Sequence, residues 1–263
     1  LCGFPYHAAE GYIAKLIRRG FKVAVCEQVE DPKLAKGLVK REVIRVVTPG
    51  TVLDSNLLEA KDNNYLAALC PAKDGYGAAF LDISTGDFSL AEVPGSENLA
   101  ELDTVLSRFT PREVVLPRSH NGSDAFLGLL RQYTHAINAA DDWTFDRETA
   151  KKTLLEHFRT ASLDGFGCSA MTTGVCAGGA ALRYIEETQK TALSNIRQVR
   201  PFLAQAYLAL DPACQRNLEL VRNIYDGSTK GTLLSVLDHT TTAMGGRKLR
   251  EWVLNPLMDI GEI

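Results

Sequence analysis

Three aspartates, Asp74, Asp82 and Asp87, lie near the ends of expected strands and could hold metal ions for phosphodiester hydrolysis. Two-metal chemistry of this kind needs several carboxylates that converge on ions roughly 3.5–4 Å apart. All three aspartates fall in or beside turns, where the side chain of aspartate commonly hydrogen-bonds the backbone. No downstream helix supplies an evident further carboxylate. The sequence therefore favours a turn role, and a two-metal nuclease is kept as an alternative.

A phosphate-binding loop is the second chemistry to consider, because Gly227-Ser228-Thr229-Lys230-Gly231 contains suitable residue types. ATP-hydrolysing loops have the spacing Gly-x-x-x-x-Gly-Lys-Ser/Thr, in which backbone amides and the lysine surround the phosphates. That spacing occurs nowhere in the 263 residues. The sequence therefore predicts that this chain has no catalytic residues and no ATPase, metal or cofactor site.

Charge is distributed unevenly along the chain, although its net value is only −3. Residues 1–50 carry nine lysines and arginines against five acidic residues, whereas residues 51–200 carry fourteen against twenty. This asymmetry indicates that only the first segment lies near phosphates. Within it, Lys36, Lys40 and Arg41 lie in and after a loop and are the candidates for contacts with phosphate. The alternative is a loop that these charges simply keep soluble.

Apolar periodicity and turn signals define the elements that would position these residues. Strands are expected at 22–26, 42–47, 65–69, 76–83, 88–93 and 113–116. Helices are expected over 9–17, 99–109, 124–133, 146–159, 174–190 and 244–254. Asp74-Gly75 and Thr85-Gly86 are typical of hairpin turns. Three successive strands followed by alternating helices and a strand predict an α/β unit with a mixed sheet.

The helix expected over 174–190 carries a charged face. Glu186, Glu187 and Lys190 point outward, and the spacing of Glu186 and Lys190 suits an i,i+4 ion pair. Gly178-Gly179 weakens the expectation of helix in the first turns, because glycine is a poor helix former.

The last 60 residues change to an all-helical pattern after Arg200-Pro201. Asp211-Pro212 has the types preferred at a helix N-cap and first helical position. Leu218, Val221 and Tyr225 are expected to form the apolar stripe of this helix, which Asp226-Gly227 ends.

The six cysteines show no Cys-x-x-Cys spacing, and they are predicted to be free, buried thiols. No run of 18 apolar residues could span a membrane, and the N-terminus has no export signal.

Seven short strings in one order make the chain resemble the bacterial DNA mismatch-repair family MutS. The strings are Gly3-Phe4-Pro5-Tyr6-His7, Cys26-Glu27-Gln28, Val47-Thr48-Pro49-Gly50-Thr51, Leu81-Asp82-Ile83-Ser84-Thr85-Gly86, Asp164-Gly165-Phe166-Gly167, Arg216-Asn217-Leu218-Glu219-Leu220 and Met244-Gly245-Gly246-Arg247-Lys248-Leu249-Arg250. The resemblance covers essentially the whole chain.

This resemblance implies a piece of a longer protein that starts after a Phe-x-Glu mismatch wedge and ends before the ATPase. Residues 1–52 would complete a mixed α/β mismatch-recognition domain, 53–197 would form a ribonuclease-H-like α/β connector, and 198–263 would begin an all-helical core. The segment from Gly3 to Thr51 favours the mismatch-repair branch over relatives that serve recombination or structure-specific DNA binding.

For the parent protein, the resemblance implies binding of mispaired duplex DNA, use of ATP with Mg²⁺, and recruitment of MutL. It also implies a homodimer in the cytoplasm, associated with the nucleoid and not with a membrane. In the family the exposed connector surface is implicated in docking MutL. Glu186, Glu187 and Lys190 are therefore the candidates for that surface, with ordinary solvated charge as the alternative.

Overall fold

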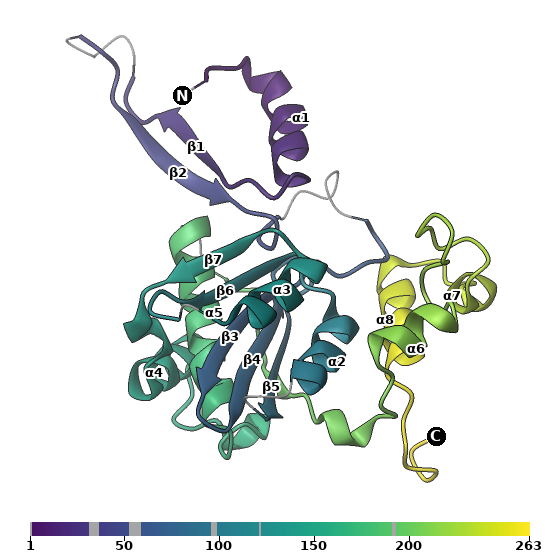
Figure 1. The fold of residues 1–263 in the computed structure, drawn as a ribbon. Helices are drawn as coiled ribbons and strands as arrows, with labels where there is room; N and C mark the ends of the chain where they lie inside the picture. Colours follow the sequence, from purple (N-terminus) through teal and green to yellow (C-terminus); the bar gives the residue numbers. More distant parts are fainter. Residues whose placement is uncertain (1, 32–36, 53–58, 96–98, 121, 191–192) are drawn as a thin grey trace.

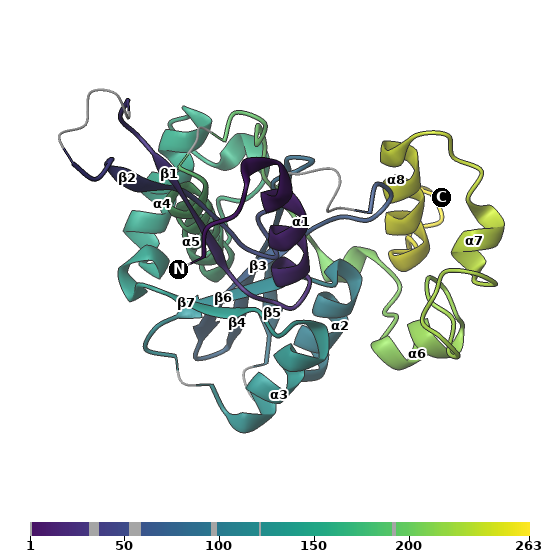
Figure 2. The same cartoon turned by 90° about the horizontal axis from the view of Figure 1, so that it is seen from above.

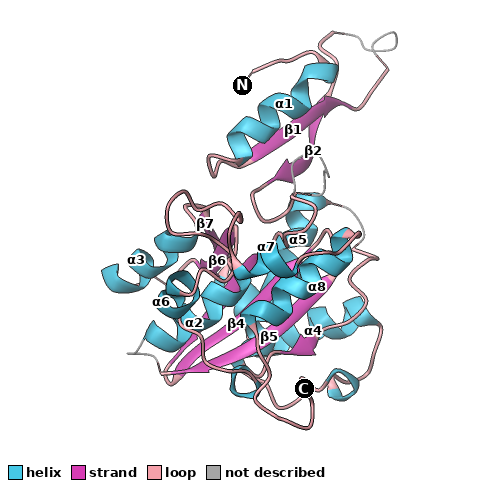
Figure 3. Cartoon of the chain, turned by 90° about the vertical axis from the view of Figure 1, so that its right-hand side faces the viewer, coloured by secondary structure: helices cyan, strands magenta, loops and turns pink. Residues whose placement is uncertain are grey.

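The computed structural model describes residues 2–31, 37–52, 59–95, 99–120, 122–190 and 193–263 (Figure 1). Its first segment consists of α1 (Tyr6–Ile17), β1 (Val23–Gln28) and β2 (Arg41–Val47). The two strands pair antiparallel and form a hairpin beside α1. We call these three elements the head, which projects from one end of the rest of the chain (Figure 3). Its small apolar core contains Ile17, Val47 and Val52.

Six strands form a second sheet in the order β7-β6-β3-β4-β5-β8. They are β3 (Leu66–Ala72), β4 (Gly75–Asp82), β5 (Asp87–Pro94), β6 (Glu113–Pro117), β7 (Ile137–Ala140) and β8 (Arg200–Pro201). Strand β4 is antiparallel to β3 and β5, whereas the other neighbouring pairs are parallel. Both predicted hairpins are confirmed, with Gly75 (φ +150°) and Gly86 (φ +78°) in conformations that favour glycine.

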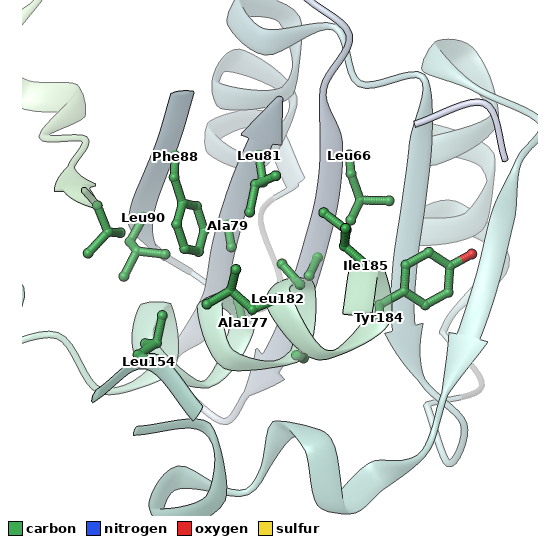
Figure 4. Packing of buried hydrophobic residues seen from close by; sticks show 14 of the residues in the cluster. Leu66, Ala79, Leu81, Phe88, Leu90, Leu154, Ala177, Leu182, Tyr184 and Ile185 are labelled. Atoms are coloured by element: carbon green, nitrogen blue, oxygen red, sulfur yellow. The ribbon is translucent and has the colours of Figure 1, made fainter. Parts of the chain in front are cut away.

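Side chains of this sheet alternate between two helical layers, because successive residues of a strand point to opposite faces. One layer contains α4 (Arg147–Phe158) and α5 (Thr173–Gln189), and Figure 4 shows Leu81 and Leu90 packed toward it. The other contains α2 (Leu99–Phe109) and α3 (Asp124–Tyr133), which cover Phe80. Figures 1 and 2 show the sheet between these helices, which confirms the mixed α/β prediction.

Helix α5 is continuous through Gly178 and Gly179, although these two glycines weakened the expectation of a helix in its first turns. A Cβ on Gly179 would lie 2.3 Å from Cα of Ala150 on α4, and one on Gly178 would lie 2.8 Å from Leu90. Glycine is therefore required here because the helix packs closely against both α4 and the sheet. Tertiary packing outweighs the low helix propensity of glycine.

The carboxylate of Glu92 on β5 holds the N-terminal end of α5. Its Oε1 accepts hydrogen bonds from the amides of Thr172, Thr173 and Gly174 at 2.6, 2.8 and 3.3 Å. Partial burial opposes ionisation of Glu92, but these amides and the Thr173 hydroxyl outweigh it and lower the pKa of the carboxyl. The first turn of α5 is thus fixed to the edge region of the sheet.

The C-terminal segment contains three helices beside the sheet (Figure 1). They are α6 (Pro212–Asn217), α7 (Leu233–Leu237) and α8 (Ala243–Leu254). The N-cap at Asp211 is confirmed, since its carboxylate accepts a 2.6 Å hydrogen bond from the amide of Cys214. The fully buried core of this segment is small and consists of Leu220, Val221, Leu234 and Leu254.

The predicted apolar stripe after Asp211 is wrong. Helix α6 ends at Asn217, and Glu219 adopts φ +45°, which a continuing helix does not allow. Leu218 is consequently 61% exposed and Tyr225 97% exposed, whereas Val221 is buried.

The remaining helical turns are 3-10 helices: η1 (Asp142–Phe145), η2 (Asp164–Phe166) and η3 (Ala204–Ala206). All six cysteines are free thiols, but only Cys168 and Cys176 are buried as predicted. Cys70 is half-buried, and the prediction is wrong for Cys2, Cys26 and Cys214, which are exposed. None of the described helices is both long and apolar enough to cross a lipid bilayer.

Candidate nucleic-acid interface and its junction with the sheet

The far end of the head hairpin carries two of the three predicted phosphate-contacting residues. Lys40 precedes β2, and Arg41 begins it opposite Gln28 at the end of β1. Both residues are exposed, and this end of the hairpin points away from the six-stranded sheet (Figure 1). Lys36 lies outside the described residues.

Arg41 and Lys40 differ in how well their charges are compensated. Lys40 Nζ lies 2.6 Å from the Glu42 carboxylate, and this hydrogen bond raises the pKa of Lys40. Among the described residues, Arg41 has no carboxylate within ion-pair distance. Arg41 therefore offers the less compensated cation, and Lys40 would have to leave Glu42 to contact a phosphate.

A buried carboxylate joins the head to the sheet. Glu113 on β6 is fully buried, and it accepts hydrogen bonds from the hydroxyls of Thr48 and Tyr184. It also accepts from the amide of Gly50 at 2.9 Å and from the side-chain amide of Asn138 at 2.6 Å. A carboxylate removed from water needs several donors, and these four groups provide them. These hydrogen bonds fix the segment after β2, through Thr48 and Gly50, to strand β6 of the six-stranded sheet.

Two further features make this junction rigid. A Cβ on Gly50 would lie 2.8 Å from Cβ of Glu113, so only glycine allows the backbone to approach this closely. Burial, assisted by the charge and hydrogen bond of Glu113, raises the pKa of Tyr184. The phenol therefore stays protonated and acts as a donor.

The six-stranded sheet and the helices on its two faces are called the sheet unit below. The C-terminal end of α5 makes the second contact between this sheet unit and the head. Gln189 Nε2 donates to the carbonyl of Thr51 at 3.1 Å, and Lys190 Nζ donates to the carbonyl of Val43 on β2 at 2.7 Å. Lys190 has φ +52° and caps the helix. It contacts the head, so it does not continue the row of outward charges that the sequence predicted.

The outward face of α5 is narrower than expected, since 13 of its 17 residues are buried. Glu187 forms a 2.9 Å ion pair with Arg183, and Glu186 lies 3.8 Å from the same guanidinium. The predicted Glu186–Lys190 pair is therefore wrong. The two glutamates remain on the surface as part of an arginine-centred cluster.

The three aspartates considered for metal binding are engaged in structural contacts or lie in a turn. Asp82 is fully buried and accepts hydrogen bonds from Asn63, Asn64 and Ser84. Its lone pairs are used to hold the loop before β3 and the turn after β4. Among the described residues no group of three His, Cys, Asp or Glu side chains could hold a metal ion.

Glu113, Tyr184 and Gln189 are the junction residues that sequence reasoning missed. The string Val47-Thr48-Pro49-Gly50-Thr51 was noticed, but only as a family resemblance and the end of a strand. The signal that could have indicated the junction is Glu113 itself, the one acidic residue of the otherwise apolar strand β6. A buried carboxylate needs hydrogen-bond donors or a cation as partners, so its presence in such a strand indicates a polar contact.

Three family models match the chain in order. MutS domain I matches residues 1–56, MutS domain II matches 64–197, and MutS domain III matches 213–263. The chain is 46% identical over its full length to the DNA mismatch repair protein MutS of Symbiobacterium thermophilum, of which it covers 30%. It is also 46% identical to the protein of that name from Lachnoclostridium phytofermentans and 42% identical to that from Protochlamydia amoebophila, covering 28% and 30% of them.

The ordered matches to MutS domains I, II and III place this head, the three-layered α/β unit and the helical segment after it in a multidomain protein of the DNA-repair class. The chain belongs to the MutS family of DNA mismatch repair proteins. It spans about 30% of the length of the curated relatives that it matches.

Proposed function

We propose that this chain supplies the DNA-proximal head, the connector and the start of the helical core of a protein that binds mispaired duplex DNA. The observation that carries this proposal is the physical link between regions matching MutS domains I and II, through Glu113 and the end of α5. The connector then couples the position of the head to the rest of the molecule. The relatives named for mismatch repair favour this reading over a recombination protein.

The connector is proposed to have a ribonuclease-H-like fold without nuclease activity. Three successive antiparallel strands extended by parallel β6 and β7, with helices on both faces, support the fold. The carboxylate of Asp82 accepts hydrogen bonds from the amides of Asn64 and Ser84, so its oxygens already have protein partners. This supports the proposal that the connector does not perform two-metal hydrolysis. Residues 1–52, 53–197 and 198–263 are the proposed domains.

The parent protein is proposed to be a DNA-dependent ATPase that uses Mg²⁺, acts as a homodimer near the nucleoid and recruits MutL. This chain would contribute neither a cofactor nor a catalytic residue to the ATPase, since it lacks the Gly-x-x-x-x-Gly-Lys-Ser/Thr spacing. Its share of the function is to position DNA and to offer a partner surface.

DNA binding by this chain is expected to be weak, salt-dependent and insensitive to mismatches. A few phosphate contacts give dissociation constants of roughly 10⁻⁴ M or weaker at physiological salt. Fluorescence anisotropy with a homoduplex and a G·T heteroduplex, each at two salt concentrations, measures this. Arg41→Gln should weaken binding to both duplexes equally, because a phosphate contact carries no sequence information.

Arg131→Gln is the matched control, since it removes the same charge from exposed α3 in the acidic part of the chain. It should leave DNA affinity unchanged. A preference for the heteroduplex above about tenfold, or equal losses in both variants, contradicts the assignment of the interface to the hairpin end.

Glu187→Lys is expected to weaken binding to the MutL N-terminal domain while the fold stays intact. The substitution replaces the ion pair with Arg183 by two like charges, which costs only about 0.4–1 kcal/mol on a helix surface. Across an interface, juxtaposed like charges cost several kcal/mol. NMR titration or crosslinking of wild type and variant measures the difference.

Glu101→Lys serves as the control, because Glu101 is exposed on α2, in the helical layer on the other face of the sheet. Equal MutL binding by wild type and Glu187→Lys would assign the α5 glutamates to ordinary solvated surface.

A further inference from the structure

A recess lies where the six-stranded sheet meets the C-terminal helices. Residues from the end of α2, from β8, from the segment after α6 and from α8 line it, and its cavity volume is about 100 Å³. The described residues that line it include two acidic side chains, Asp62 and Glu251. They also include six arginines: Arg108, Arg112, Arg200, Arg222, Arg247 and Arg250. The recess therefore has four more positive than negative charges.

Arg108 is the most deeply buried of these cations, with 6% of its surface exposed. Its guanidinium donates to uncharged acceptors, the side-chain oxygen of Asn255 at 3.2 Å and the carbonyl of Leu208 at 3.0 Å. Its buried Nε has no hydrogen-bond partner among the described residues. Burial lowers the pKa of Arg108, as expected for a charge removed from water without a carboxylate.

Arg250 is 9% exposed and has only a 3.6 Å contact with Asp62 to balance its charge. Burial lowers the pKa of Arg250, Asp62 opposes this effect, and the positive charges of Arg222 and Arg112 add to it. Arg112 and Arg222 are exposed, and their guanidinium groups form no ion pair with a described residue. The positive charges of Arg112 and Arg222 therefore both repel the guanidinium of Arg250 in this part of the recess.

Of the other two arginines, only Arg200 has a close carboxylate partner, in a 2.9 Å ion pair with Asp87. Arg247 is half-buried and donates to the uncharged carbonyl of Ala60 at 2.6 Å. Apart from Arg200, the arginines of the recess therefore have no carboxylate closer than the 3.6 Å contact of Arg250 with Asp62 among the described residues. Buried cations normally have a paired anion, because an unpaired charge removed from water is costly.

We propose that this recess binds one phosphate group, either as free phosphate or as the phosphate of a larger molecule. Planar guanidinium forks suit the oxygens of a tetrahedral oxyanion. A volume of about 100 Å³ corresponds to roughly three water molecules' share of liquid volume, enough for one such group. The bound group bridges the α/β unit, through Arg108 at the end of α2 and Arg112 just before β6, to the C-terminal segment, through Arg222 and Arg250.

Isothermal titration of the 263-residue chain with inorganic phosphate, at constant ionic strength, tests the proposal. We expect saturable binding with one site. Arg112→Gln/Arg222→Gln should weaken it by about tenfold or more, because two charge-assisted contacts are lost at exposed positions that leave the fold intact. Arg118→Gln/Arg131→Gln, which removes two exposed arginines that do not line the recess, should bind phosphate as wild type does.

A short DNA duplex used as a competitor identifies the source of the group. Displacement of phosphate by the duplex would assign the site to a backbone phosphate, and no displacement would assign it to a free phosphate or small phosphorylated molecule. The absence of saturable phosphate binding, or the same affinity in both double variants, would overturn the proposal. Circular dichroism of each variant verifies that the fold is retained.

Discussion

Glu113→Ala is expected to lower the free energy of unfolding by about 3 kcal/mol or more. The substitution removes a fully buried carboxylate and leaves the donors of Gly50, Asn138 and Tyr184 without their acceptor. Each buried group left unsatisfied costs about 1–3 kcal/mol. The loss should also free the head, since Thr48 and Gly50 are then no longer fixed to β6.

Urea unfolding followed by tryptophan fluorescence measures this change. In a Trp252→Phe background, Trp143 on η1 is the sole reporter, and its ring lies 5.6 Å from the Arg183 guanidinium on α5. Glu10→Ala, at an exposed position on α1, is the control and should alter stability by less than about 0.5 kcal/mol. A loss below about 1 kcal/mol for Glu113→Ala would show that the junction does not depend on the carboxylate.

Gly179→Ala is expected to lower the free energy of unfolding by roughly 2 kcal/mol, from an overpacking cost near the upper end of its range less the gain in helix propensity. The new methyl group would lie 2.3 Å from Cα of Ala150, so α4 and α5 must move apart. Overpacking of this kind costs typically 1–3 kcal/mol, and here the clash is with backbone that cannot change its rotamer. The gain in helix propensity from glycine to alanine, roughly 0.5–1 kcal/mol, offsets only part of it.

Gly128→Ala on α3 is the matched control, because nothing lies within 4 Å of the position its Cβ would take. It should stabilise the protein by up to about 1 kcal/mol, from helix propensity alone. The same urea measurement distinguishes the two variants. Stabilisation by Gly179→Ala would mean that the close contact between α4 and α5 is not maintained in solution.

Elements with strong local signals could be predicted from the sequence. The hairpins at Gly75 and Gly86 and the N-cap at Asp211 each rest on residues adjacent in the chain. The stripe after Asp211 could not be predicted, because the turn at Glu219 depends on its φ of +45° and on tertiary packing of Leu220. In this segment the local pattern did not show which of the three apolar residues the fold buries.

The junction around Glu113 and the arginine recess could not be predicted from the sequence, because residues far apart in the chain form them. Glu113 and Thr48 are 65 residues apart in the chain, and no local pattern connects them. The recess combines Arg108 and Arg112 with Arg222 and Arg250, although residues 201–263 carry six basic and seven acidic residues and are nearly neutral as a segment. Charge sums over segments cannot reveal a cluster that the fold assembles.

Helix α5 is held at both ends by hydrogen bonds, and it therefore connects strand β5 to the head as one rigid element. Its 17 residues span about 25 Å. Glu92 holds the first turn, while Gln189 and Lys190 hold the carbonyls of Thr51 and Val43. A tilt of the head relative to the sheet would therefore break those two hydrogen bonds or push the helix along its axis. In the second case the displacement reaches Glu92 on β5, at the end of α5 that is farther from the head.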